Sequence, residues 1–367
     1  MFTAASLIRP ALAALEPYTP ILPLDVLAAR LGLPIERLVK LDANENPYGP
    51  SPKALAALAN EAYYHIYPDP GHTSLRAALA AYTDHPAAHI VCGAGADELI
   101  DLILRLCLAP GEAVIDCPPT FGMYSFDTGV CGGRVVVVPR RPDFSLDLPA
   151  IEQAANTNGA KILFLTSPNN PTGNLMPPEE LERLLRLPLL VVVDEAYIEF
   201  AGLDQSFAPW VRQHANLAVL RTFSKWAGLA GLRVGYGLFP PWLAEQLWKI
   251  KQPYNVSVAA QTAACASLAD RAYLFDNVAR LCAERERLWH HLAALPFLKP
   301  YPSAANFILC RVVGRAAHAL KLTLEQQGIL VRYYNNPYLH DYLRVSVGTP
   351  AQSDALLAAL REVSANG

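Results

Sequence analysis

Three apolar runs of the sequence each end in side chains that could bind or react with a small ligand. KILFLTS leads into SPNNPTG (167–173), LLVVV is followed by DEAY (194–197), and LAVLRTF is followed by a serine and Lys225. In an open parallel sheet, ligands bind beyond the carboxyl ends of the strands. An amide, a carboxylate with a phenol, and a lysine would therefore meet at one sheet edge, although each of them alone could be an ordinary strand end.

A fourth segment, VCGAGADE (91–98), predicts an anion site. Two glycines lie directly before an apolar-periodic helix, and the first N–H groups of a helix have no partner within it and attract negative charge. The third glycine of a dinucleotide-binding fingerprint is absent, because position 98 is Glu. The dinucleotide interpretation therefore fails, while a plain helix-capping turn remains an alternative to the anion site.

These segments need a sheet to position them, and the pattern of the chain predicts one. AVIDCP, RVVVVP and the three runs above are short, rich in β-branched residues and closed by turns, which is typical of strands buried on both faces. Helical repeats such as ADELIDLILRLCL and PEELERLLRL separate such runs. The alternation predicts an α/β fold with a mostly parallel central sheet and right-handed crossovers.

After residue 257 the pattern changes to α+β. A helical tract runs from about 259 to 295, and NFILCRV, a helix near 315–327, GILVRYY and YLRVSVG follow it. We expect a large α/β domain over 43–257 and a smaller α+β domain over 258–367. The first 42 residues would join the smaller domain as an N-terminal arm, because about 40 residues are too few to fold alone.

Composition excludes several classes of protein. Lys+Arg 30 against Asp+Glu 33 gives a formal net charge of -3, which supplies no basic face for nucleic acid. No apolar stretch approaches the roughly 20 residues of a membrane span, and the opening residues lack the pattern of a signal peptide. The seven cysteines are never two residues apart and no HExxH motif occurs. We therefore expect no disulfide framework, no metal and a cytoplasmic location.

SPNNPTG, VVVDEAYIEF and RTFSKWAGLAGLRVGY resemble the signature of the fold-type I aminotransferases, which use pyridoxal 5'-phosphate (PLP). LDANENPYGPSPKA, YPDP, GADE, PYNVS and LRVSVGT are similar to the histidinol-phosphate branch of that family, and the resemblance covers about residues 8–362. It implies transamination between L-glutamate and imidazole acetol phosphate, giving L-histidinol phosphate and 2-oxoglutarate in histidine biosynthesis. Aromatic amino-acid transamination and threonine-phosphate decarboxylation stay open as alternatives. A cofactor-sensing regulator would need an appended DNA-binding module, for which the pattern leaves no room.

The resemblance also implies roles for residues at the cofactor. Lys225 would form the Schiff base with the PLP aldehyde and move the α-proton, and Asp194 would pair with the pyridinium nitrogen. Tyr197 and Asn170 would hydrogen-bond the ring oxygen, and Phe121 would stack on the ring where relatives often carry Tyr. The PLP phosphate would be bound by backbone N–H groups, hydroxyls and a guanidinium of Ala96, Asp97, Thr222, Ser224 and Arg233.

Other residues are expected, by the same resemblance, at the substrate and between subunits. Arg344 in YLRVSVG and Arg332 in GILVRYY would bind the substrate's carboxylate or phosphate, since guanidinium binds either anion in bidentate fashion. Tyr18 and Asn44 would line the same pocket. Tyr67 matches a tyrosine that reaches the cofactor phosphate of the neighbouring subunit, which implies a homodimer with shared active sites.

Overall fold

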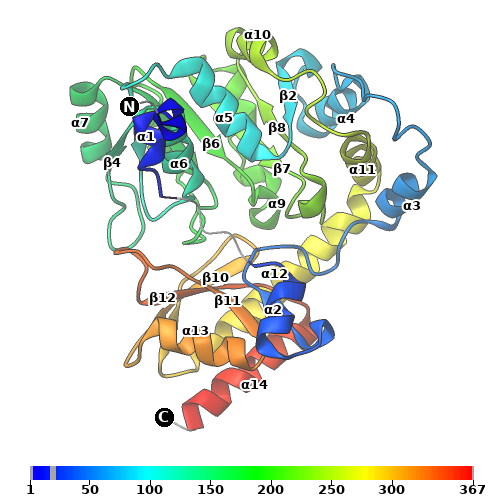
Figure 1. Ribbon diagram of the computed structural model, residues 1–367, viewed down its shortest axis with the longest axis vertical. Helices are drawn as coiled ribbons and strands as arrows, with labels where there is room; N and C mark the ends of the chain where they lie inside the picture. The colour runs from blue at the N-terminus through cyan, green and yellow to red at the C-terminus, as the bar shows by residue number, and fades with distance from the viewer. Residues whose placement is uncertain (1–2, 17–21, 366–367) are drawn as a thin grey trace.

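Two β-sheets organise the chain, which is described by a computed structural model covering residues 3–16 and 22–365 (Figure 1). Among these residues the larger sheet has seven strands in the order β2-β8-β7-β6-β5-β3-β4, and the smaller sheet has five in the order β1-β11-β12-β10-β9. The same described part of the chain contains no helix with the length and apolar character of a membrane span.

The larger sheet is mostly parallel, as the sequence predicts. Its strands are β2 (Ile90–Gly93), β3 (Ala113–Asp116), β4 (Arg134–Val137), β5 (Ala160–Thr166), β6 (Leu190–Asp194), β7 (Leu217–Thr222) and β8 (Gly235–Leu238). Strands β3 to β7 pair in parallel, whereas β8 runs antiparallel to both β7 and β2. The sequence pattern does not predict β2 and β8, because these four-residue strands, IVCG and GYGL, contain glycines that break the apolar pattern.

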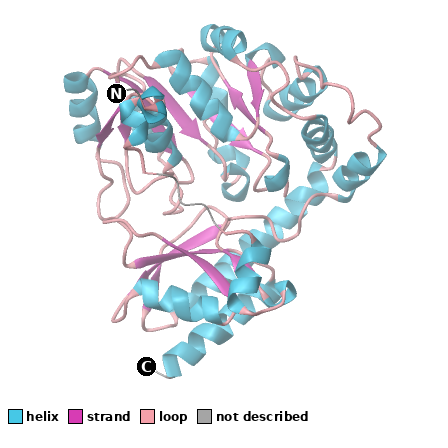
Figure 2. Cartoon of the chain, viewed as in Figure 1, coloured by secondary structure: helices cyan, strands magenta, loops and turns pink. Residues whose placement is uncertain are grey.

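Helices cover both faces of the larger sheet (Figure 2), because successive strand residues point to opposite faces. In β6, Leu190 and Val192 pack with α5, α6 and α10, whereas Val191 and Val193 pack with α4, α7, α8 and α11. Both faces of the strand are therefore buried, which explains its continuous apolar run. The helices of this part are α3 (Pro52–Asn60), α4 (Thr73–Thr83), α5 (Ala96–Cys107), α6 (Met123–Val130), α7 (Leu148–Asn158), α8 (Pro178–Leu184), α9 (Ile198–Ala201), α10 (Pro241–Ile250) and α11 (Val258–Ala269).

The smaller sheet has its own core and receives one strand from the N-terminal part of the chain. Its strands are β1 (Val39–Leu41), β9 (Leu298–Pro300), β10 (Phe307–Val312), β11 (Ile329–Tyr333) and β12 (Tyr342–Ser346), with helices α2 (Leu24–Leu31), α12 (Arg271–Ala293), α13 (Ala317–Gln326) and α14 (Pro350–Ala365) nearby. β1 is parallel to β11, and the other pairs are antiparallel. The short helix α1 (Pro10–Ala13) packs against α6 of the larger part.

The predicted α+β pattern after residue 257 is confirmed, with one difference. The tract expected as one helix from about 259 to 295 is two helices, because the first ends and the second begins at Asp270. Leu274 and Leu281 of α12 pack in the larger core, whereas Leu288 and Leu292 pack in the smaller one. α12 therefore connects the two cores, and the boundary at 257/258 stays a prediction.

Candidate active site

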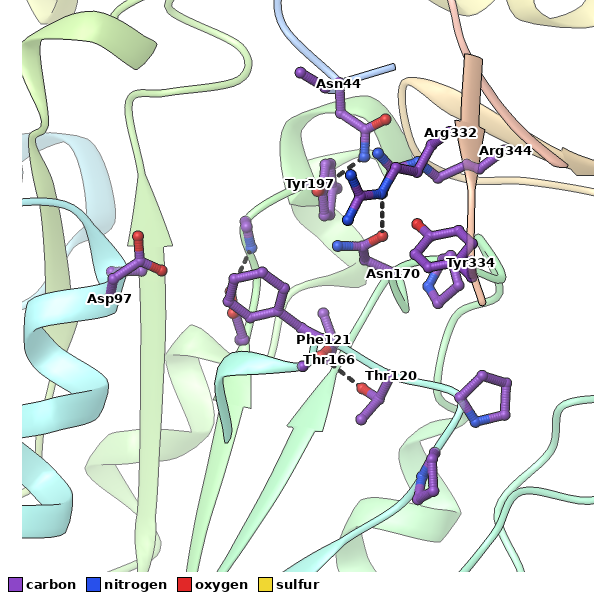
Figure 3. Close-up of a pocket in the computed structure, with 18 of the residues that line it drawn as sticks. Asn44, Asp97, Thr120, Phe121, Thr166, Asn170, Tyr197, Arg332, Tyr334 and Arg344 are labelled. Carbon is purple, nitrogen blue, oxygen red and sulfur yellow. Dashed lines mark hydrogen bonds between the residues drawn. The ribbon is translucent and has the colours of Figure 1, made fainter. Parts of the chain in front are cut away.

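A cavity of about 770 Å³ lies where the carboxyl ends of the large-sheet strands face the smaller sheet (Figure 3). Its size falls within the roughly 300–1,000 Å³ that is usual for small-molecule sites. The predicted residues that line it are Asn44, Ala96, Asp97, Phe121, Asn170, Asp194, Tyr197, Thr222, Ser224, Lys225, Arg233, Arg332 and Arg344. Tyr18 lies outside the described residues, and Tyr67 is not part of the cavity.

Lys225 follows β7 and presents an amine with an unusual acidity. Burial, followed by the charges of Arg344 and Arg233, lowers its pKa to about 8. Its Nζ donates a hydrogen bond to the carbonyl of Ala43 at 3.2 Å, and none of the ion pairs in the described part of the chain involves it. About a tenth of the amine is therefore uncharged at pH 7, far more than for an ordinary lysine, and the uncharged form is the one that can attack a carbonyl carbon.

Asp194 ends β6 and presents a buried carboxylate. Its Oδ2 accepts a hydrogen bond from the Tyr124 hydroxyl at 2.8 Å, and its Oδ1 accepts one from the Ala196 N–H at 3.0 Å. Burial raises the pKa of Asp194 to about 6. The next residue, Glu195, is instead paired with Arg221 at 2.9 Å outside the cavity. Asp194 has no such cation in the described structure, so it suits a ligand atom that carries a positive charge.

The start of α5 forms an anion cradle with Arg233. Gly95 precedes the helix at φ +84°, and no side chain caps the first N–H groups. A Cβ at Gly95 would lie 2.6 Å from Nη2 of Arg233, so only glycine lets the guanidinium approach the turn. Arg233 donates to Asp97 at 2.8 Å and to the Ser224 hydroxyl at 3.4 Å, and Thr222 donates to Ser224 at 2.9 Å. One guanidinium, two hydroxyls and a helix N-terminus thus converge, an arrangement suited to binding a phosphate.

Two arginines of the smaller sheet line the same cavity. Arg332 on β11 and Arg344 on β12 are directly opposite each other across the strand pair. Arg344 is 6% exposed and donates to the Asn170 side chain at 2.6 Å and to the Asp42 carbonyl at 2.7 Å, while its buried Nε has no partner. Adjacent like charges repel each other. An anionic group of a ligand would relieve this repulsion and satisfy the remaining donor.

Asn44 joins this side of the cavity to Tyr197. The Asn44 side chain donates to the Tyr197 hydroxyl at 3.1 Å and accepts from Ser346 of β12 at 2.8 Å, and the Asn44 carbonyl accepts from Asn306 at 2.9 Å. Burial raises the pKa of Tyr197 to about 12. Tyr197 therefore stays a neutral phenol that can give a hydrogen bond to a ligand oxygen.

The cavity fits the cofactor that the resemblance implies. A phosphate suits the anion cradle, a protonated pyridine nitrogen suits the buried Asp194, and an aldehyde suits the amine of Lys225. The half-buried Phe121 lines the same space, so its ring is available to cover a flat ring. The structure thus brings the predicted cofactor residues of this chain together, while the role of each remains a prediction.

Tyr67 lies elsewhere, on the loop between α3 and α4. Its side chain is 77% exposed and stacks on Tyr254, with ring centres 4.5 Å apart. Tyr63, Tyr64 and Ile66 are also exposed on this loop. Tyr67 does not reach the cavity of its own chain, which leaves the predicted contact with a neighbouring subunit untested.

Sequence reasoning missed several residues near the cavity. The Tyr124 hydroxyl donates a hydrogen bond to Asp194. The Thr166 hydroxyl contacts that of Tyr124, and the Thr120 hydroxyl contacts that of Thr166. Tyr334 lines the cavity near Arg332, whose guanidinium lies 5.5 Å from its ring centre. A signal existed for Tyr124, which follows Phe121 by three residues, and for Thr166, which ends an apolar run. No sequence pattern marked Tyr334.

Comparisons with known proteins agree with this geometry. Residues 36–360 match the model of the family described as aminotransferase class I and II. The chain is 57% identical to the histidinol-phosphate aminotransferase of Roseiflexus castenholzii, with 98% of each chain covered. It is 53% identical to the chloroplastic histidinol-phosphate aminotransferase of Nicotiana plumbaginifolia, covering 98% of this chain and 87% of the relative.

Solved structures have the same fold. The histidinol-phosphate aminotransferase of Sinorhizobium meliloti in complex with PLP superposes with a TM-score of 0.89 at 31% identity, covering 98% of both chains. The L-threonine-O-3-phosphate decarboxylase of Porphyromonas gingivalis superposes with a TM-score of 0.78 at 23% identity, covering 88% of this chain and 98% of the other. The second likeness concerns the fold alone.

Proposed function

We propose a function from the premise that the chain belongs to the aminotransferase class I and II family and, within it, to the histidinol-phosphate aminotransferases. The chain has histidinol-phosphate aminotransferase activity, which belongs to histidine biosynthesis, and this activity depends on PLP. The proposed reaction moves the amino group of L-glutamate to imidazole acetol phosphate, giving L-histidinol phosphate and 2-oxoglutarate. We also propose a cytoplasmic location, which the scattered cysteines favour.

The large-sheet side of the cavity would hold the cofactor. When bound, PLP supplies an aldehyde for the amino group and a ring that withdraws electrons from the α-carbon of the substrate. Arg233, Ser224, Thr222 and the start of α5 bind the phosphate. Asp194 accepts the pyridinium N–H, and Phe121 covers one ring face. Lys225 would bind the aldehyde through Nζ, and the same Nζ would take up and give back the α-proton of the substrate.

The small-sheet side would bind the substrates. Arg344 and Arg332 carry two adjacent positive charges, so they accept the carboxylates of L-glutamate in one half-reaction and the phosphate of histidinol phosphate in the other. Asn170 orients Arg344 through its side-chain oxygen, and Asn44 orients the Tyr197 hydroxyl. The observation that carries the proposal is that Lys225 shares one cavity with this arginine pair and with the buried carboxylate at the end of β6.

A substrate panel tests the proposed reaction. The purified PLP-loaded protein is mixed separately with histidinol phosphate, phenylalanine, tyrosine and threonine phosphate, and amino transfer to 2-oxoglutarate and carbon dioxide release are measured. Histidinol phosphate should give the largest kcat/KM for amino transfer, by at least about tenfold over phenylalanine and tyrosine, because neither of these offers a dianionic phosphate to the two arginines. A preference for phenylalanine or tyrosine would instead assign an aromatic aminotransferase, and carbon dioxide from threonine phosphate would assign a decarboxylase.

We further propose that the protein is a homodimer in which Tyr67 completes the site of its partner. The exposed aromatic loop around Tyr67, stacked on Tyr254, supports this interface. Mixing inactive Tyr67→Ala with inactive Lys225→Ala subunits tests it, because a heterodimer then has one site with both residues intact. Each heterodimer should recover up to roughly half of the wild-type activity. With subunit exchange verified, no recovery would show that Tyr67 acts with Lys225 of its own subunit and would refute sharing.

A further inference from the structure

A buried tyrosine outside the cavity is joined directly to the carboxylate of the proposed active site. Tyr124 on α6 is 0% exposed, and its ring lies parallel to that of Phe164, with ring centres 4.9 Å apart. Its hydroxyl lies 2.8 Å from Oδ2 of Asp194 and 2.8 Å from Oγ1 of Thr166. Apolar packing fixes the ring, so the hydroxyl has a defined place between these two groups.

When Asp194 is ionised, the hydrogen bonds around this hydroxyl have only one possible direction. A carboxylate accepts but cannot donate, and each hydroxyl has a single proton. Tyr124 must therefore donate to Asp194, and Thr166 must donate to the Tyr124 oxygen. The Thr120 hydroxyl lies 3.4 Å from Thr166 but gives its proton to Asn169 at 2.9 Å, so it is not a donor to Thr166 (Figure 3 shows the contact between the two threonines). The charged form of Asp194 is therefore supported by two donors in series, Thr166 to Tyr124 and Tyr124 to Asp194.

Thr120, which contacts Thr166, also helps to join the two loops that carry other proposed cofactor residues. Thr120 immediately precedes Phe121, and Asn169 immediately precedes Asn170. The Asn169 amide donates to the Pro119 carbonyl at 3.0 Å and so ties the two loops together. Removal of the Tyr124 hydroxyl would therefore affect the hydrogen bonds of both Asp194 and Thr166.

We propose that Tyr124 is a positioning residue for the transamination, whose hydroxyl orients the Asp194 carboxylate and keeps it ionised opposite the pyridine nitrogen of the cofactor. This inference rests on the proposed function. Its physical basis is that each carboxylate oxygen has one protein donor, Tyr124 on Oδ2 and the Ala196 N–H on Oδ1. The remaining lone pairs can face the ring nitrogen, and both donors favour the charged carboxylate.

The electrostatic surroundings make this donor important. Burial disfavours the charged form of Asp194, and the hydrogen bond from Tyr124 is the largest effect that lowers its pKa. Among the other titratable groups near this pair, Asp97 on α5, Asp116 at the end of β3 and Glu195 after β6 oppose the charge, and Tyr197 is neutral. Arg140 is a buried cation that interacts with Asp116 and Tyr124. Removal of the Tyr124 hydroxyl should therefore move the pKa of Asp194 upward.

The test uses Tyr124→Phe, which removes one oxygen and keeps the ring. Tyr82→Phe is the matched control, because the Tyr82 hydroxyl lies 3.3 Å from another buried carboxylate, Glu199, away from the cavity. Three measurements are made on the PLP-loaded proteins: kcat and KM against pH, PLP affinity of the apoprotein, and the ¹⁵N resonance of the pyridine nitrogen in labelled PLP. The resonance reports protonation at the ring nitrogen without any turnover.

In Tyr124→Phe, the acidic limb of kcat should move up by about one pH unit, with KM little changed, because Asp194 then takes up a proton at higher pH. The ¹⁵N resonance should shift toward that of an unprotonated nitrogen at neutral pH, and kcat should recover at alkaline pH. Tyr82→Phe should match the wild type in each measurement. An unchanged limb and resonance in Tyr124→Phe would mean that Tyr124 only fills the core, and would overturn the inference.

A second pair of variants decides the matter if Tyr124→Phe does not fold. Thr166→Val removes the donor to Tyr124 and should shift the limb and the resonance in the same direction by less, whereas Thr166→Ser should restore both. No shift in Thr166→Val would contradict the inference. A wild-type protein that binds PLP without transaminating would refute the proposed function alone, because the ¹⁵N resonance would still test Tyr124.

Discussion

The two sides of the cavity are built in different ways. On the cofactor side, Asp194 and Lys225 follow neighbouring parallel strands, and α5 begins beside them. The topology of a parallel sheet brings such residues to one edge wherever the strands are buried. On the substrate side, Arg332 and Arg344 come from an antiparallel pair of the smaller sheet, and Asn44 comes from the N-terminal segment. Their meeting depends on strand register and on contacts between distant segments.

This difference indicates which side of the cavity can alter substrate selectivity. Asp194 is fixed within the core of the larger sheet, by Tyr124 and by the backbone. Arg344 reaches the cofactor side through one side-chain hydrogen bond to Asn170, and Arg332 is only partly buried. Changes on the cofactor side should therefore abolish turnover of every substrate, whereas changes on the substrate side should alter which substrate is used.

The largest effect is expected for Lys225→Ala. Transamination of every substrate should fall by at least about 10⁴-fold, because the variant lacks both the nucleophile and the proton carrier. The visible absorption of the lysine-bound cofactor, and its trapping by borohydride, should be lost with it. A borohydride-stable link between cofactor and variant would show that another lysine is the carrier.

Asp194→Asn should have the next largest effect and should again affect all substrates alike. An amide has no charge to stabilise a protonated pyridine, so removal of the α-proton should slow by roughly 10²–10⁴-fold while PLP stays bound. The rate with α-deuterated and ordinary L-glutamate measures this step. Activity within about tenfold of the wild type, a barrier change of only ~1.4 kcal/mol, would rule out the role.

Arg344→Lys and Arg332→Lys, both on the substrate side, should change substrate binding to different extents. Arg344→Lys should lower kcat/KM about 100-fold for both L-glutamate and histidinol phosphate, because lysine cannot replace the bonds to Asn170 and Asp42 while binding an anion. Arg332→Lys should cost about tenfold and act mainly on histidinol phosphate. Steady-state kinetics with each substrate check this, and equal losses for the two variants on both substrates would contradict the distinction.

The smallest effect concerns the stability of the apoprotein and its pH dependence. The pKa of Lys225 is about 8 in the fold and near 10.5 when unfolded, so the unfolded chain binds more protons between these pH values. Stability of the wild type should rise through that window. Below pH 8, Lys225→Met should be more stable than the wild type by about 1–3 kcal/mol, with the advantage fading above pH 10.

Urea unfolding of the two apoproteins at several pH values measures this difference. Lys249→Met is the matched control, because that lysine is 59% exposed on the surface and its replacement should change stability little at any pH. A Lys225→Met protein with the stability of the wild type at pH 7 would mean that the amine is not desolvated in the apoprotein.

Sequence reasoning found the parallel strands, and the cavity residues at their ends, because each of these motifs stands next to its own strand. SPNNPTG, DEAY and the segment with Lys225 are readable from local order alone, as is the glycine turn before α5. The strands β2 and β8 were not recognised, since four residues with glycine carry too little periodicity. Likewise the break at Asp270 was missed, because helical periodicity continues on both sides of it.

The sequence by itself determined the α/β class, the carboxylate and lysine at the strand ends, and the family resemblance, because these depend on residue types at short separations. Only the tertiary structure decided that Tyr124 donates to Asp194, that Arg332 lies opposite Arg344, and that Asn44 bridges Tyr197 to the smaller sheet. Such contacts join residues tens or hundreds of positions apart. Their geometry is set by strand register and core packing, which no short stretch of sequence specifies.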